Sequence, residues 1–230
     1  MKEIQAQALD AFVASARSSF GADLVSVVLF GSGAEDKLRA TSDVNVILLL
    51  KSFDPAKGRS FRDPLALATA SIRLRAMFLL ESEAGEAAEL FAVKFSDVRR
   101  RYRVLWGTDL IKDLQIPRQA AIARLNQVLL NLSIRLREKF MEEGAYEERL
   151  AFVVADAAGP LRACAAEILE LEGTPAATPK EALQRIAGIG LAAVSEARET
   201  GVLPAGTAEP LLLELTKVAE AMKARAERLT

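Results

Sequence analysis

Two short segments carry most of the information about this fold: Leu29-Phe30-Gly31-Ser32-Gly33-Ala34 and, after a short loop, Ser42-Asp43-Val44-Asn45-Val46. Each segment joins an apolar run of mostly Val and Leu, over residues 24–30 and 44–50. Short apolar runs bounded by turn residues are typical of buried strands. The glycines between the runs force a tight turn. The sequence therefore predicts two neighbouring buried strands joined through a Gly-Ser turn.

The residues at this turn are of the kinds that bind phosphate and metal. Gly31 lets the backbone approach a phosphate closely, and Ser32 adds a hydroxyl donor beside the free N–H groups of a helix start. Asp43 and position 45 are two residues apart on a strand, so their side chains point to the same face. Carboxylates there hold magnesium ions against a triphosphate. Gly31, Ser32 and Asp43 are thus the predicted nucleotide-binding residues.

This pattern resembles the motif of the DNA polymerase β-type nucleotidyltransferase superfamily, and of its small bacterial members in particular. Gly31, Ser32, Ala34, Ser42 and Asp43 match the motif with the same spacing, whereas Asp36 replaces a glycine frequent in the loop. The segments 91–97 and 102–107 resemble the third catalytic strand of the group and the stretch after it. The resemblance covers about half of the chain. It implies an NTP substrate, Mg²⁺ as cofactor and two-metal transfer of a nucleoside monophosphate to a hydroxyl.

The pattern departs from the family at the metal-binding positions. Asn45 stands where the family has Asp or Glu, and Lys94 stands at the position aligned with the third carboxylate. An asparagine brings no charge, and a lysine at a metal position repels the ion and can pair with Asp43. The resemblance therefore implies a vestigial catalytic set of Asp43, Asn45 and Lys94. We predict that Asp43 is the one metal ligand left and that Mg²⁺ binding is weak or absent.

The rest of the first half reads as a small α/β domain. Residues 2–20 and 63–82 are predicted to be helices, 52–63 a loop and 90–95 a third strand. Gly85 is expected to interrupt the chain between them. The order of strands and helices is mixed, which indicates a mixed sheet and not a long parallel one.

Beyond Pro117 the pattern becomes helical throughout. Apolar residues step by three and four over residues 122–140, 150–171 and 211–222, which is typical of amphipathic helices. Thr178-Pro179 is a predicted helix start, and Pro160 is expected to kink its helix. The fold class is therefore α+β: a nucleotidyltransferase-fold domain with a mixed sheet over residues 1–114, followed by a helical bundle domain over residues 115–230.

Composition narrows the function further. The chain has a net charge of −1, which makes nucleic acid an unlikely partner, and no histidine, which excludes catalysis by His. The arginines around Tyr102 are expected to form a solvated turn. Cys164, the single cysteine, lies on an apolar helix stripe and is predicted to be a buried thiol. With no membrane span and no signal peptide in the sequence, we expect a cytoplasmic protein.

Three functions remain open from the sequence. The first is a nucleotidyltransferase-like protein of impaired activity that keeps nucleotide or phosphate binding in a regulatory role. The second is an active enzyme that moves a nucleoside monophosphate from NTP to a hydroxyl of a small molecule or protein. Its helical half would supply the acceptor side, as in the aminoglycoside nucleotidyltransferases that the architecture resembles, and Glu89 or Asp97 would assist Asp43. The third is a structural homodimer built through the helical half.

Overall fold

The computed structural model describes residues 3–35, 43–188 and 191–229. The chain forms two compact units, each with its own core. Unit 1 consists of Met1–Ala88 and Val98–Gln115, and unit 2 of Glu89–Asp97 and Ile116–Thr230. The segment 89–97 thus belongs with the helical unit, although it lies in the first half of the sequence. A functional domain boundary at residue 115 stays a prediction.

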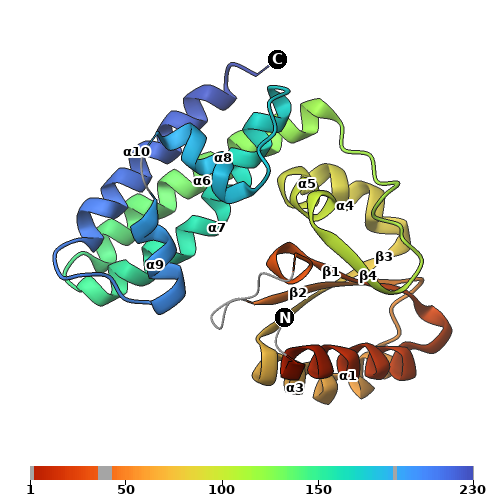
Figure 1. Ribbon diagram of the computed structural model, residues 1–230. Helices are drawn as coiled ribbons and strands as arrows, with labels where there is room; N and C mark the ends of the chain where they lie inside the picture. Colours follow the sequence, from red (N-terminus) through yellow and green to blue (C-terminus); the bar gives the residue numbers. More distant parts are fainter. Residues whose placement is uncertain (1–2, 36–42, 189–190, 230) are drawn as a thin grey trace. The chain divides into compact units, whose positions relative to one another are not determined.

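Unit 1 is built on a four-stranded sheet with the strand order β3-β2-β1-β4 (Figure 1). β1 is antiparallel to both β2 and β4, whereas β3 is parallel to β2, so the sheet is mixed, as predicted. The strands span Leu24–Phe30 (β1), Val44–Leu50 (β2), Leu74–Leu80 (β3) and Tyr102–Gly107 (β4). β1 and β2 have the predicted bounds.

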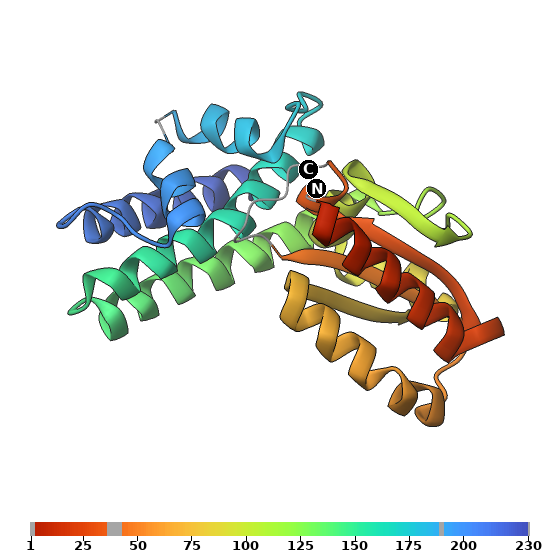
Figure 2. The ribbon, with the colours of Figure 1, turned by 60° about the horizontal axis from the view of Figure 1, so that its bottom comes forward.

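Two helices, α1 (Glu3–Phe20) and α3 (Arg62–Ile72), lie side by side against one face of this sheet (Figures 1 and 2). The strand residues that face them alternate, as the strand period requires: Val44, Val46, Leu48 and Leu50 of β2 belong to their core. Asn45 therefore points to the opposite face. Short elements complete this part of the chain: η1 (Gly21–Asp23), η2 (Gly31–Gly33), α2 (Pro55–Ser60), η3 (Glu81–Glu83) and α4 (Ala84–Leu90).

The predicted helix over residues 63–82 is wrong in its second half. α3 ends at Ile72, and Arg73 turns the chain with a left-handed backbone (φ 53°) into β3. A short and mostly apolar run such as residues 74–80 is compatible with a helix and with a strand, so the sequence pattern does not distinguish them. The outcome is set by the free edge of β2, along which β3 pairs in parallel register from Val44↔Leu74 to Leu50↔Leu80.

The predicted strand over residues 90–95 is also wrong. α4 runs through Gly85 to Leu90, and α5 (Ala92–Arg100) follows directly, so residues 92–100 are helical and the fourth strand is Tyr102–Gly107. Alanine and glutamate dominate α4, which leads directly into α5, and both residue types favour helix. The predicted loop 52–63 likewise contains α2, whose N-cap Asp54 accepts a 2.7 Å hydrogen bond from the Ala56 N–H.

Unit 2 is a helical bundle, as predicted. α10 packs against α6 and α7, α6 packs against α7, and α8 and α9 pack against α7. The helices span Arg118–Glu143 (α6), Glu147–Leu171 (α7), Pro179–Ala187 (α8), Ala192–Thr200 (α9) and Ala208–Ala226 (α10). Thr178 caps α8 as predicted, because its hydroxyl accepts a 3.1 Å hydrogen bond from the Glu181 N–H. α7 continues through Pro160.

The segment 89–97 is held in unit 2 by one apolar and one polar contact. Val93 is buried within the bundle core, and the Ser96 hydroxyl donates a 3.0 Å hydrogen bond to the buried Glu167 carboxylate. Across residues 3–35, 43–188 and 191–229, no helix combines the length and the apolarity that a bilayer-spanning segment requires.

Candidate functional site

The Gly-Ser turn follows β1 directly. Gly31 adopts φ 73°, a conformation that L side chains rarely take, and its N–H donates a 2.9 Å hydrogen bond to the Arg101 carbonyl. That N–H is therefore already used within the fold. The Ser32 side chain is half-buried and hydrogen-bonds to none of the residues that the structure describes. Of the two predicted phosphate donors, Ser32 is the one whose polar group remains available.

Asp43 and Asn45 lie beside this turn, because Phe30 at the end of β1 pairs with Asn45 of β2. Asp43 immediately precedes β2, and its side chain is 35% exposed. Asn45 is half-buried, and its amide donates a long 3.4 Å hydrogen bond to the backbone carbonyl of Asp43. Asp36 and Ser42, the other motif positions in this loop, lie outside the described residues.

Two arginines, from the start of β3, approach the Asp43 carboxylate. The Nε of Arg73 lies 3.0 Å from Asp43 Oδ1, and the Nε of Arg75 lies 3.8 Å from Asp43 Oδ2. Arg75 is directly opposite Asn45 in the parallel register, so both point to the sheet face that α1 and α3 leave free. One carboxylate thus faces two guanidinium groups, which gives this edge a net charge of about +1.

The sheet corrects the strand on which the third carboxylate position was expected. The resemblance places that carboxylate on the strand next to Asp43 and residue 45, and in the sheet the neighbour of β2 that begins beside Asp43 is β3. Its residue opposite Asn45 is Arg75, and not Lys94. The signal in the sequence was Arg75, the single charged residue inside the apolar run 74–80, together with Arg73 directly before that run.

Lys94 lies on α5, in unit 2, and the premise that placed it on a strand is wrong. Desolvation lowers the pKa of its ammonium group from the ordinary value. Glu89 and Asp97, the carboxylates expected to assist Asp43, lie on α4 and α5 within the same unit. A role for Lys94 in the site stays a prediction. Ser32, Asp43, Asn45, Arg73 and Arg75 lie at or next to the end of β1 and the starts of β2 and β3. These five residues are called the sheet edge.

The edge does not carry a ready-made cluster of metal ligands. Within the parts of the chain that the structure describes, no group of three or more Asp, Glu, His or Cys side chains is arranged to hold an ion. Magnesium binding in proteins depends on carboxylate oxygens. Asp43 is the carboxylate of this edge, and its two oxygens face the arginines.

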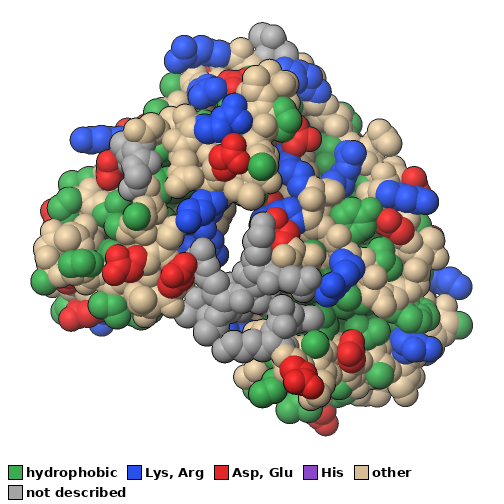
Figure 3. Space-filling model, viewed as in Figure 1, with side chains coloured by type: hydrophobic (Ala, Val, Ile, Leu, Met, Phe, Trp, Pro, Cys, Tyr) green, Lys and Arg blue, Asp and Glu red, His purple; other side chains and the backbone are tan. Residues whose placement is uncertain are grey.

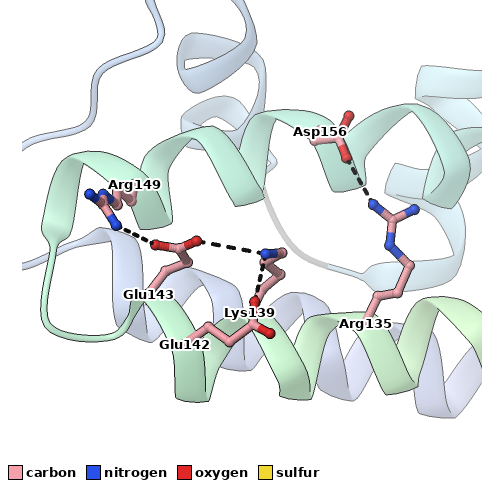
Figure 4. A network of polar contacts seen from close by, with 6 residues as sticks. All are labelled: Arg135, Lys139, Glu142, Glu143, Arg149 and Asp156. Atoms are coloured by element: carbon pink, nitrogen blue, oxygen red, sulfur yellow. Dashed lines mark hydrogen bonds and ion pairs between the residues drawn. The ribbon is translucent and has the colours of Figure 1, made fainter.

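A pocket lies between α6 and α7 in unit 2. Its volume is about 320 Å³, and its lining includes the apolar Leu132, Leu136 and Val153. Ion pairs span its rim, as Figure 4 shows: Lys139 with Glu142 (2.6 Å) and Glu143 (3.6 Å), Arg149 with Glu143 (3.2 Å), and Arg135 with Asp156 (3.7 Å). Each charge at this rim already has a partner of opposite sign.

Charges of both signs are interspersed over the face shown in Figure 3. The predicted arginine turn divides between two elements, with Arg99 and Arg100 on α5 and Arg103 on β4. Arg101, between them, pairs with Glu35 at 3.2 Å. One charge of this turn is thus paired within unit 1.

Comparison with known proteins identifies the fold. No family model and no curated protein sequence matches the chain, whereas ten solved chains match its structure. One of them covers 95% of this chain and 99% of its own length with a TM-score of 0.66 and 12% sequence identity. The protein therefore has the nucleotidyltransferase fold, as its sequence predicts. That neighbour is the spectinomycin adenyltransferase AAD(9) from Enterococcus faecialis, solved with ATP and spectinomycin.

Proposed function

We propose that this protein binds a nucleotide at the edge formed by Ser32, Asp43, Asn45, Arg73 and Arg75, and that its nucleotidyl-transfer activity is impaired. The observation that carries the proposal is the pairing of Asp43 with Arg73 and Arg75 where the family places its metal-binding carboxylates. The nucleotidyltransferase fold and the ATP of the neighbouring structure support a nucleotide as the ligand. Its role is then binding or regulation.

The chemistry of transfer explains the impairment. Two-metal catalysis stabilises the attacking and the leaving oxygens with two divalent ions, which the protein holds through several carboxylates. Here Asn45 contributes a neutral amide and Arg75 a positive charge. A guanidinium at a metal position repels the ion and pairs with the Asp43 carboxylate that would otherwise bind it.

The test is to restore the carboxylates. In the double variant Asn45→Asp/Arg75→Glu, three carboxylates would again meet at one edge, and we expect Mg²⁺ to increase ATP affinity at least tenfold, about 1.4 kcal/mol. ATP binding would be titrated by calorimetry with Mg²⁺ and with EDTA. The matched control is Asn45→Asp/Arg62→Glu, which makes the same change of charge with the second substitution at the start of α3. We expect no such gain in the control.

Transfer itself is measured as pyrophosphate release from ATP, with hydroxyl acceptors that include spectinomycin. We expect no release above background from the wild type. Robust Mg²⁺-dependent release by the wild type would contradict impairment and support the active-enzyme alternative. No ATP binding by the wild type, with or without Mg²⁺, would contradict the proposal of a nucleotide ligand and favour the structural homodimer.

A further inference from the structure

We propose that Arg73 and Arg75 bind the polyphosphate of the nucleotide directly, in the place of divalent metal, so that binding requires no metal ion. This inference rests on the proposed function, because it concerns the same edge. It names what would hold the phosphates: two guanidinium groups that project from the start of β3. The nucleotidyltransferase fold would then present its ligand to fixed cations of the chain and not to ions taken up with the substrate.

The geometry leaves the phosphate-binding side of each arginine free. Arg73 and Arg75 each approach Asp43 through Nε, at 3.0 Å and 3.8 Å. The two terminal nitrogens of each guanidinium bond to none of the described residues. A guanidinium that is fixed at one edge and open at the other is suited to bidentate bonds with phosphate oxygens. Asp43 thereby orients both guanidinium groups.

Exposure agrees with this arrangement. The side chains of Arg73 and Arg75 are 58% and 69% exposed, whereas Asp43 behind them is 35% exposed. An ion pair between exposed groups contributes little to stability. The two arginines are therefore not explained by the stability of the sheet. They present at least four free N–H-bearing nitrogens to an approaching anion, next to the unbonded hydroxyl of Ser32.

The backbone of Arg73 is a second, independent indication. Arg73 is the C-cap of α3 and takes a left-handed conformation (φ 53°, ψ 40°); among the described residues it is the only one besides glycines with a positive φ. Glycine usually occupies this position, because the Cβ of any other residue crowds the backbone in this conformation. Strained residues of this kind cluster at ligand-binding sites. The unfavourable backbone conformation of Arg73 is thus accompanied by a guanidinium that reaches Asp43 from this position.

The experiment separates the guanidinium from the fold. We would titrate ATP, tripolyphosphate and adenosine into the wild type in EDTA and again in Mg²⁺. We expect ATP and tripolyphosphate to bind in EDTA, adenosine to bind at least tenfold more weakly than ATP, and Mg²⁺ to raise ATP affinity by less than threefold. Binding in EDTA should weaken as the salt concentration rises, because the contact is between fixed charges and phosphate.

Arg73→Gly is the most informative variant, because it removes the side chain and relieves the strained backbone at once. It should lower affinity for ATP in EDTA at least tenfold while leaving the thermal midpoint unchanged or higher. Arg73→Lys should retain part of the affinity. The matched control is Arg62→Ala, at the opposite end of α3, about 16 Å away at 1.5 Å per residue; this variant should bind as the wild type does.

Each other outcome overturns the inference in a recognisable way. ATP binding that needs Mg²⁺, or that survives both Arg73→Gly and Arg75→Ala, would contradict phosphate binding by the arginines but leave the proposed nucleotide binding intact. Equal affinity for adenosine and ATP would do the same. Absence of ATP binding under both conditions would overturn the inference and the proposed nucleotide ligand together. Metal-free binding with rapid pyrophosphate release would uphold the inference and contradict only the impairment of transfer.

Discussion

The charge at two sheet positions decides what this edge can bind. Asn45 and Arg75 lie opposite each other on β2 and β3. Asp43, directly before β2, therefore has two cations beside it, Arg73 just before β3 and Arg75 on β3, and β2 contributes no second carboxylate. A carboxylate at both positions would favour divalent ions, whereas a guanidinium favours phosphate oxygens. The proposed loss of transfer and the proposed gain of direct phosphate contact therefore follow from the same two side chains.

Gly107, the last residue of β4, should be among the least replaceable positions of unit 1. It adopts φ 84°, and a Cβ there would lie 2.1 Å from the backbone carbonyl oxygen of Val25. Gly107→Ala would force β4 away from β1, and we expect it to lower the free energy of unfolding by more than about 3 kcal/mol. Chemical denaturation would measure the loss. Gly21→Ala is the control: its φ is 56°, but no atom lies within 4 Å, so its cost should be near 1 kcal/mol.

Cys164 should be inert in the folded protein. It is fully buried, as its place on the apolar stripe predicts, and burial, with a smaller contribution from the charge of Glu167, raises the pKa of its thiol to about 12. The thiolate is the reactive form, so a thiol reagent at pH 8 should react no faster than the protein unfolds. Rapid labelling under native conditions, measured by the absorbance of the released reagent, would contradict this burial.

At the scale of elements, the sequence predicts those whose pattern has one interpretation. β1 and β2 are short, apolar and bounded by turns, and α6, α7 and α10 keep a three- and four-residue step over many turns. β3 could not be separated from α3, because the turn between them is made by Arg73 where glycine would have marked it. The run from Leu90 to Phe95 predicts a strand because it is short and mostly apolar, whereas the structure places these residues at the end of α4 and in α5.

The candidate site was predictable to the same extent. Asn45 lies on β2, and Gly31, Ser32 and Asp43 lie directly next to the ends of β1 and β2 that pair through Phe30 and Asn45, both of which the sequence defines. The cation at the third position could not be assigned, because that requires knowing which strand pairs with β2 and in which register. The sequence prediction named Lys94 as the cation beside Asp43, whereas the ion pairs of Asp43 in the structure are with Arg73 and Arg75.

The N-cap of α8 gives a prediction at this scale. Thr178 accepts a 3.1 Å hydrogen bond from the Glu181 N–H, and Pro179 follows it at the first helical position. Thr178→Ala removes this acceptor and should lower the free energy of unfolding by about 1 kcal/mol. Thr178→Ser keeps the hydroxyl and should cost less than half as much. Equal losses in the two variants, from urea titrations followed by circular dichroism, would argue against capping.

Pro160 gives another prediction at the scale of elements. It lies exposed in the interior of α7, where it lacks the N–H that would donate to the carbonyl of Asp156. Pro160→Ala restores that donor and should stabilise the protein by about 1–2 kcal/mol, after the greater freedom of the unfolded chain is allowed for. Pro210→Ala is the matched control, because Pro210 lies in the first turn of α10, where no N–H is needed. A lower midpoint for Pro160→Ala would mean that the packing of α7 depends on the proline.

At the scale of the whole molecule, the fold persists where the sequence has diverged far. The neighbouring adenyltransferase shares 12% of its residues with this chain, yet the match covers 95% of the chain at a TM-score of 0.66. Two separate cores, one around the sheet and one in the helical bundle, account for this, because each needs only apolar residues at the correct period. The chemistry of the sheet edge is then free to change without loss of the fold.

A crystal grown with ATP and Mn²⁺ tests the central claim most directly, because manganese is located by its anomalous scattering independently of the phosphates. We predict that the phosphate oxygens of ATP lie within hydrogen-bonding distance of the terminal nitrogens of Arg73 and Arg75, and that no anomalous peak lies at the Asp43 carboxylate. An anomalous peak bonded to Asp43, with the arginines turned away from the phosphates, would contradict the account and identify a working metal site.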